Sequence, residues 1–223
     1  ITPLKDRFGA EIRTHYPREL EAEVGVISQE AHLTAKVPDY LLQIVARFAR
    51  YLRESTSVDQ RSGVSARFAI AAAETVAASA RHRGALLGEA DPVARVVDLG
   101  TVIDVLRGKL EFESGEEGRE QAVLEHLLRR ATADTAQKAL GGIDVAPLLA
   151  AVEAGSAVTT GEQVPAKDVL AALPGLPVID TIAERLGART DGERAAALEL
   201  ALEALYLAKK LDKTTGDGET TYG

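Results

Sequence analysis

The sequence predicts a mainly α-helical protein, and two observations lead to this prediction. Hydrophobic residues make up 46% of the 223 residues, with Ala and Leu the commonest among them, whereas aromatic residues make up only 4%. This mixture favours helices, because Ala and Leu have high helix propensity and strands are enriched in aromatic and β-branched side chains. Apolar residues also recur at helical spacing in every periodic segment after about residue 28, as Leu41, Ile44, Val45 and Phe48 do on one face.

The first 28 residues have a different pattern. Residues 11–16 alternate briefly between polar and apolar side chains, which predicts a short strand, and Pro17 ends it. The rest of this part is expected to be loop and linker. The helical segments that follow are expected at residues 39–54, 64–83, 98–110, 121–140, 144–154, 166–173, 178–186 and 191–211.

Proline, glycine and capping residues indicate where several of these helices begin and end. Pro38 suits a first helical turn, and Gly84 is expected to stop the helix that begins at residue 64. Thr190 or Asp191 is expected to cap the last helix, with Glu193 in its first turn.

The chain is therefore expected to divide into four parts. These are a strand-and-loop segment at residues 1–28, a helical module at 29–110, a second helical module at 111–213 and a disordered tail at 214–223. The boundary after residue 110 rests on an acidic, glycine-bearing stretch that follows it, and the region 155–165 is expected to be another loop.

Charge and composition exclude several classes of function. The net charge is −8, from 26 basic and 34 acidic residues, and no basic cluster of the kind that binds duplex nucleic acid is present. There are no cysteines, which excludes disulfides and thiolate metal sites and fits a cytoplasmic protein. No apolar run approaches the roughly 18 residues that a membrane span needs. Nucleic acid and membrane are therefore not expected as partners.

Arg67 is the most informative candidate for a binding residue. It lies in the first turn of an expected helix, two residues after Ser65, where the helix dipole disfavours a cation by about 0.3–1 kcal/mol. A bound anion would explain this position, and phosphate is the commonest anion at a helix N-terminus. The alternative is an ordinary surface arginine that pairs with Glu74 or Asp59. Ser65 has no histidine partner at a useful spacing, so it is expected to cap the helix rather than to act as a nucleophile.

The remaining candidate groups are expected to have ordinary roles. No two of the four histidines are spaced as metal ligands, so surface or core positions are expected for them; they are His15, His32, His82 and His126. An acidic cluster is expected to be a solvated loop, with weak binding of a divalent cation or a basic partner as the alternative; it comprises Glu111, Glu113, Glu116 and Glu117.

Two motifs resemble segments of AAA+ ATPases. Gly63, Ser65 and Arg67 form a Gly-x-Ser-x-Arg pattern, which is similar to the sensor 2 motif that opens the lid helix of these enzymes. Near the start of the chain, Arg7 lies in an Asp-Arg-Phe segment that resembles the one in the magnesium-chelatase and MoxR branch. The two motifs follow each other in the family's order, and the resemblance covers about residues 1–85.

The resemblance implies a role for each part. Arg7 would be an arginine finger that reaches the ATP site of a neighbouring subunit, with a solvated loop arginine as the alternative. Arg67, Ser65 and Gly63 would be nucleotide-binding residues, with Arg67 reaching the phosphates in its own subunit. Residues 1–28 would be the remnant of the α/β ATPase core, residues 29–110 the helical lid, and the acidic module that follows an accessory domain.

The sequence lacks the two motifs that hold nucleotide and magnesium in such enzymes. It contains no Gly-x-x-x-x-Gly-Lys-Ser/Thr loop and no hydrophobic strand that ends in Asp-Glu. We therefore expect the chain to be the C-terminal part of a longer protein, without turnover of its own. The whole protein would use ATP and Mg²⁺, assemble into a ring and remodel a client protein or a von Willebrand A-domain partner. A stand-alone helical interaction module, in which both arginines are ordinary, is the alternative.

Overall fold

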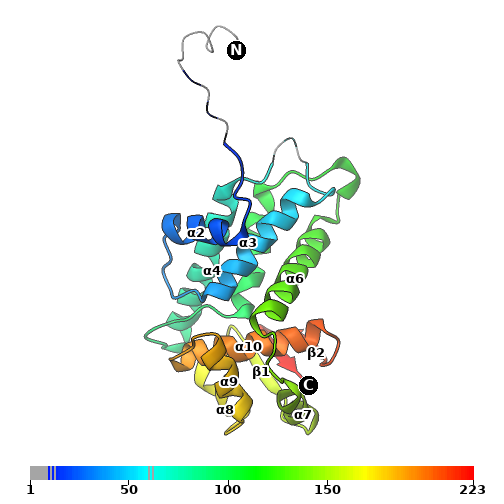
Figure 1. Ribbon diagram of the computed structural model, residues 1–223. Coiled ribbons are helices and arrows are strands. Elements are labelled where there is room, and N and C mark those ends of the chain that lie inside the picture. Colours follow the sequence, from blue (N-terminus) through cyan, green and yellow to red (C-terminus); the bar gives the residue numbers. More distant parts are fainter. Residues whose placement is uncertain (1–9, 11, 13, 60, 62) are drawn as a thin grey trace.

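A computed structural model of the chain describes residues 10, 12, 14–59, 61 and 63–223. Helices dominate this part, as the sequence predicts, and a single small sheet accompanies them (Figure 1). The α-helices are α2 (Leu20–Glu30), α3 (Asp39–Glu54), α4 (Ala66–Leu87), α5 (Gly100–Leu106), α6 (Glu120–Ala139), α7 (Ala146–Glu153), α8 (Ala166–Ala171), α9 (Pro177–Arg185) and α10 (Asp191–Leu207). The strands are β1 (Val158–Gly161), β2 (Lys213–Gly216) and β3 (Glu219–Tyr222), and the 3-10 turns are η1 (Val96–Leu99), η2 (Arg107–Lys109) and η3 (Ser114–Glu116).

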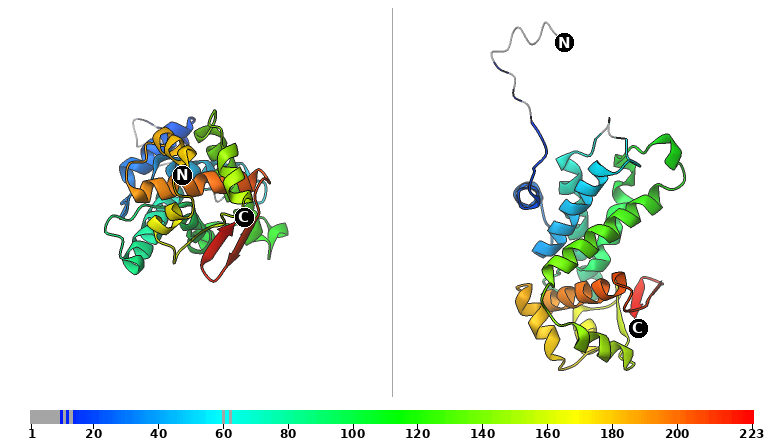
Figure 2. Two further views of the ribbon diagram at one scale, coloured as in Figure 1. Left: turned by 90° about the horizontal axis from the view of Figure 1, so that it is seen from below. Right: turned by 45° about the vertical axis from the view of Figure 1, so that its right-hand side comes forward.

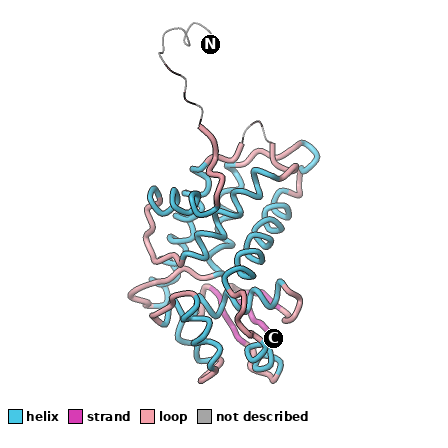
Figure 3. The backbone as a smooth tube through the Cα atoms, viewed as in Figure 1, coloured by secondary structure: helices cyan, strands magenta, loops and turns pink. Residues whose placement is uncertain are grey.

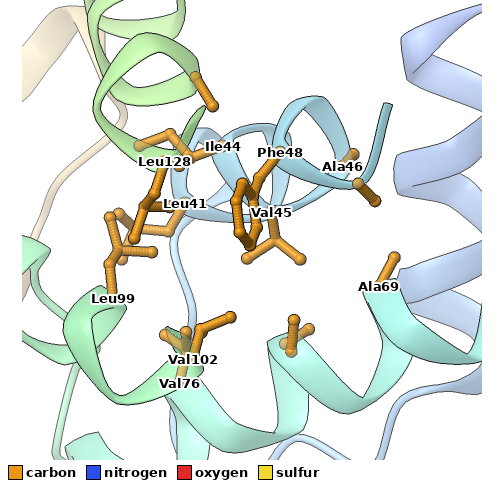
Figure 4. Packing of buried hydrophobic residues seen from close by; sticks show 14 of the residues in the cluster. Leu41, Ile44, Val45, Ala46, Phe48, Ala69, Val76, Leu99, Val102 and Leu128 are labelled. Carbon is orange, nitrogen blue, oxygen red and sulfur yellow. The ribbon is translucent and has the colours of Figure 1, made fainter. Parts of the chain in front are cut away.

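Helices α2 to α6 form the first bundle, with α3 at its centre. The apolar face of α3 is buried, α2, α4 and α6 pack against α3, and α5 packs against α4 and α6. Figure 4 shows Leu41 and Ile44 of α3 beside Leu128 of α6, with Val76 of α4 and Val102 of α5 on the other side of the same core. Helical periodicity in the sequence therefore places most of this core correctly.

The second core surrounds α10. Helices α7, α8 and α9 and the three-stranded antiparallel sheet, in the order β1-β3-β2, pack around it. Leu198, Leu202 and Leu205 of α10 are buried in this core, whereas Leu200 of the same helix belongs to the first one. Figure 2 shows α10 lying across the end of the first bundle, so one helix serves both cores.

The division between the two cores differs from the expected one. Helix α6 packs against α3 and contributes Leu124 and Leu127 to the first core, so the break comes after α6 and not after residue 110. The acidic stretch that suggested a boundary is held in place, because Val58 and Phe112 form an antiparallel bridge and Ser57 Oγ donates to Glu116 Oε1 at 2.9 Å. Glu111, Glu113 and Glu117 are exposed, as expected for a solvated loop, whereas Glu116 is half-buried.

Several expected helix ends agree with the structure, but α4 extends beyond its expected end, and α5 and α10 end four residues before theirs. The expected helix at residues 39–54 matches α3, and Thr190 caps α10 in a capping box with Glu193. Helix α4 continues through Gly84 and ends at Gly88, which has a φ of +71°. Gly84 is instead required for packing, because a Cβ there would lie 2.5 Å from Cβ of Pro92.

The two ends of the chain contain regular structure that was not expected. Helix α2 occupies the predicted linker, and the described residues of the predicted strand at 11–16 are not in a strand. The tail forms a β-hairpin, β2 and β3, which pairs with the unexpected strand β1 and buries Tyr222 (Figure 3). Asp217 and Gly218 connect the hairpin with positive φ values of 52° and 77°, and Asp-Gly is a strong hairpin signal.

None of the helices within the described part of the chain is long and apolar enough to span a membrane.

Candidate functional site

Arg67 lies in the first turn of α4, where the sequence places it, and its side chain is exposed. Neither alternative partner pairs with it. Glu74 Oε1 instead accepts a hydrogen bond from the backbone N–H of His32 at 2.9 Å, and Asp59 forms an ion pair with Arg61 at 3.1 Å. Among the described residues Arg67 has no hydrogen-bond or ion-pair partner, and the first turn of α4 contains no acidic residue.

Ser65 is the N-cap residue of α4, but it does not cap the helix with its side chain. Its backbone is extended, with φ −68° and ψ 161°, and its hydroxyl accepts no hydrogen bond from the first turn. The predicted side-chain cap is therefore wrong. The carbonyl of Ser65 accepts the backbone N–H of Phe68 at 3.0 Å. The start of α4 thus combines an exposed guanidinium with backbone N–H groups that no capping side chain occupies, which are the features of an anion site.

Gly63 shapes the loop that leads into this turn. Its φ is +67°, a conformation that other residues adopt with strain, and a Cβ there would lie 3.3 Å from the hydroxyl oxygen of Tyr16. The glycine of the Gly-x-Ser-x-Arg pattern is therefore explained by local geometry. The absence of a side chain at Gly63 also leaves room for the Tyr16 hydroxyl beside the loop before α4.

Arg53 at the end of α3 fixes the same loop from inside the protein. Its Nε donates to the carbonyl of Val64 at 2.8 Å, and its Nη2 forms an ion pair with Glu23 Oε1 of α2 at 2.7 Å. The guanidinium also stacks on the ring of Tyr16, with Cζ 4.2 Å from the ring centroid. One largely buried arginine thus joins α2, α3, Tyr16 and the loop that leads into α4.

Sequence reasoning missed this arginine and its carboxylate partner, although a signal exists. Glu23 lies on the apolar face of α2, which Leu20, Val24 and Ile27 define. A carboxylate on a buried face needs a cation, because an unpaired buried charge is costly. That requirement predicts a partner for Glu23 but does not identify Arg53, which follows it by 30 residues.

The other arginine motif lies outside the described residues. Arg7 belongs to residues 1–9, so the structure neither places it nor tests its predicted role. Tyr16, which is described, stacks against Arg53.

A second polar cluster lies at the opposite end of α4. Arg83 is buried and donates from Nη2 to Asp98 Oδ2 at 3.1 Å and to the carbonyl of Val93 at 2.7 Å, while its Nη1 donates to Glu89 Oε2 at 3.1 Å. Asp98 also accepts the backbone N–H of Arg95 at 2.7 Å. These contacts hold the segment between α4 and α5 against the C-terminal part of α4.

Arg95 continues this cluster into the second core. Its side chain is fully buried, its Nη2 donates to the carbonyls of Gly161 and Val164 at 2.6 and 2.8 Å, and its Nε lies 3.4 Å from Glu199 Oε1 of α10. Burial raises the pKa of Glu199, and the positive charge of Arg95 opposes that shift. We call Arg83, Arg95, Asp98 and Glu199 the junction cluster, because they join the two cores.

No metal centre accompanies either cluster: the described residues contain no group of three or more His, Asp or Glu side chains that could hold a metal ion. In comparisons with known proteins, no family model, no curated protein and no solved structure matches this chain. The functional argument therefore rests on the residues and their geometry.

Proposed function

We propose that this chain is the C-terminal portion of an AAA+ ATPase of the magnesium-chelatase/MoxR type, with α4 as the lid helix that senses nucleotide. One observation carries the proposal. Arg67 is exposed and has no hydrogen-bond or ion-pair partner among the described residues, although it stands in a first helical turn, where a cation is disfavoured. Arg53 holds the loop that leads into this turn. Arginine at such a position is suited to the phosphates of a bound nucleotide.

In this proposal the nucleotide lies between the lid and an ATPase core that supplies the phosphate-binding loop and the magnesium ligands. Arg67 binds the phosphates in its own subunit, and Arg7 reaches the site of the next subunit in a ring. An arginine supplied in this way stabilises the charge on the transferring phosphoryl group and contributes about 10³–10⁵ in rate where it operates. ATP and Mg²⁺ are the cofactors of the whole protein.

The contacts on α4 suggest how nucleotide binding is transmitted. Arg67 lies at the first turn of the helix, and Arg83 of the junction cluster lies near its other end. A rigid helix between the two would carry a change at the phosphates to α10 and the second core as a rigid-body rotation. The second core would then move a bound client protein or a von Willebrand A-domain partner.

ATP turnover by the full-length encoded protein tests this proposal. The variants are Arg67→Ala and Arg7→Ala, with the present chain alone as the blank, which we expect to be inactive. Arg61→Ala is the matched control, because Arg61 is an exposed arginine of the same loop that is already paired with Asp59. We expect turnover to fall in the first two variants and to persist in the control. Equal turnover in all of them would contradict the proposal.

The alternative is a stand-alone helical interaction module, and one surface feature favours it. Leu86 of α4 and Val105 of α5 are exposed by 68% and 59% and line the same depression of about 280 Å³. Exposed apolar side chains that share a depression are typical of docking surfaces. Absence of turnover in the full-length wild-type protein would favour this alternative.

A further inference from the structure

A second cavity lies where the two cores meet, away from Arg67. It encloses about 280 Å³, close to the lower limit of pockets that bind small molecules. Side chains from η1, α6, α10 and all three strands line it, so it exists only because the C-terminal hairpin folds back against the first bundle. The proposed ATPase role assigns nothing to this cavity.

A carboxylate and an ammonium group form its polar wall. Glu203 of α10 is almost fully buried, and its Oε2 accepts hydrogen bonds from Tyr222 Oη at 2.6 Å and from Lys213 Nζ at 2.7 Å. Burial raises the pKa of Tyr222, and the charge of Glu203 raises it further, so the phenol keeps its proton and remains a donor. The second oxygen, Glu203 Oε1, accepts no hydrogen bond from any part of the chain that the structure describes.

Hydroxyl groups line the neighbouring floor of the cavity. Thr160, Thr220 and Thr215 occupy adjacent positions across β1, β3 and β2, and all three line the cavity. The hydroxyls of Thr215 and Thr220 lie 3.2 Å apart. Threonine hydroxyls donate and accept hydrogen bonds, so this row suits a ligand with polar groups of both kinds.

The rest of the lining includes apolar side chains and a second cation. Val96, Leu99 and Leu128 come from η1 and α6, and Arg129 follows Leu128. Arg129 is more than half exposed, and its ion pair with Glu125 is long, at 3.9 Å. A surface pair of this kind is weak, so the guanidinium is available to a stronger anionic partner.

We propose that this cavity binds a free α-amino acid with an apolar side chain. The ligand's carboxylate is placed against Lys213 and Arg129, its ammonium group donates to Glu203 Oε1, and its side chain contacts Leu99 and Leu128. Three properties of the cavity favour this class: cations and a carboxylate line the same small space, the carboxylate has an unused acceptor, and apolar side chains belong to the lining. A simple anion would leave Glu203 Oε1 without a donor, and a simple amine would bring no negative charge to Lys213 and Arg129.

Titration of the ¹⁵N-labelled chain with L-leucine, followed by NMR, tests this proposal. We expect saturable shifts of the amide signals of Thr160, Thr215 and Thr220. 4-Methylpentanoate lacks the ammonium group and 3-methylbutylamine lacks the carboxylate, so each should bind about tenfold more weakly or worse. Equal binding of all three compounds, or no saturable shift with L-leucine at about 10 mM, would overturn the proposal.

Matched variants separate binding from folding. Lys213→Gln and Arg129→Gln should each weaken L-leucine binding about tenfold. Their controls are Lys210→Gln, an exposed lysine of the same tail, and Arg130→Gln, whose guanidinium stacks on Tyr51 outside the cavity. Because Lys213 also supports the hairpin, its variant must retain the amide spectrum of the second core. Arg129 is a surface residue, so unchanged binding in Arg129→Gln and Lys213→Gln would contradict the assigned carboxylate site.

Discussion

The two ends of α4 use arginine in opposite ways. Arg67 in the first turn is exposed and has no partner among the described residues, whereas Arg83 near the other end is 2% exposed and makes three hydrogen bonds. The buried guanidinium is committed to the protein's own carboxylates and carbonyls. The exposed one is available to an anion from outside. The difference separates an arginine that holds the fold together from one that is suited to a ligand.

Arg53 and Arg95 belong with Arg83 on the structural side of this comparison. Arg95 is fully buried and the Arg53 side chain is only 10% exposed, and each joins elements that are distant in the sequence. Burying such a side chain is costly, and the cost is offset only while its partners remain in place. The two classes of arginine should therefore respond differently to the same substitution.

The largest effect is expected for Arg95→Ala. This change leaves the charge of Glu199 buried without its partner and removes the donors to the carbonyls of Gly161 and Val164. Breaking a buried ion pair from one side costs about 3–5 kcal/mol, so the free energy of unfolding in urea should fall by that amount.

A double variant sharpens this first prediction. In Arg95→Met with Glu199→Leu neither charge remains buried, so the loss should be smaller than in Arg95→Ala. If Arg95→Ala unfolded at the same urea concentration as wild type, the structural role assigned to the junction cluster would be wrong.

The next effect is the dependence of stability on acid pH, which involves Glu193 in the first turn of α10 and should be independent of Arg67. Burial of Glu193 opposes ionisation, but the Lys36 ammonium and the backbone N–H groups of Thr190 and Arg189 outweigh it and lower its pKa from 4.5 to about 2. A lowered pKa in the folded state contributes stability above pH 4.5, and that stability is lost as the pH falls from about 4.5 to 2. The shift corresponds to at most about 3 kcal/mol.

Urea unfolding at a series of pH values measures this contribution. Glu193→Gln should unfold with a shallower dependence of stability on pH between about 4.5 and 2 than the wild-type protein. Arg67→Ala, at the other end of the comparison, should keep the wild-type dependence. The same slope in Glu193→Gln and wild type would show that other carboxylates dominate.

A smaller effect is expected for Tyr222→Phe in the hairpin. The hydroxyl donates to Glu203 Oε2 in a buried position, and its removal should lower the free energy of unfolding by about 1–2 kcal/mol. Tyr206→Phe is the control, because the Tyr206 hydroxyl makes no hydrogen bond with a described residue, and it should stay within about 0.5 kcal/mol of wild type. Equal stability of the two variants would contradict the buried hydrogen bond.

The sequence predicts the helices well because their signal is local. Leu41, Ile44 and Phe48 reveal α3 by spacing alone, and Thr190 with Glu193 reveals the start of α10. The hairpin was missed because a threonine-rich tail of low hydrophobicity resembles a disordered one. Its burial depends on Glu203, which belongs to a helix that precedes it.

The candidate site is predictable in part for the same reason. The Gly-x-Ser-x-Arg pattern is local, so Gly63 and Arg67 are found from sequence, and the structure explains the glycine. Arg53 and Arg95 act through partners 30 or more residues away, and no local pattern identifies such pairs. The predicted hydroxyl cap at Ser65 failed because a suitable residue type does not fix the direction of its side chain.

The smallest effect on stability is expected for Arg67→Ala. Because the side chain is exposed and makes no hydrogen bond or ion pair with a described residue, the free energy of unfolding should stay within about 0.5 kcal/mol of wild type. Pyrophosphate should shift the amide signals of residues 66–68 in the wild-type chain and in Arg61→Ala, but not in Arg67→Ala. If Arg67→Ala instead lost stability as Arg95→Ala does, Arg67 would belong with the structural arginines. If Arg67→Ala were stable and still bound pyrophosphate, the first turn of α4 would bind the anion without the arginine. Another residue would then have to be the sensor.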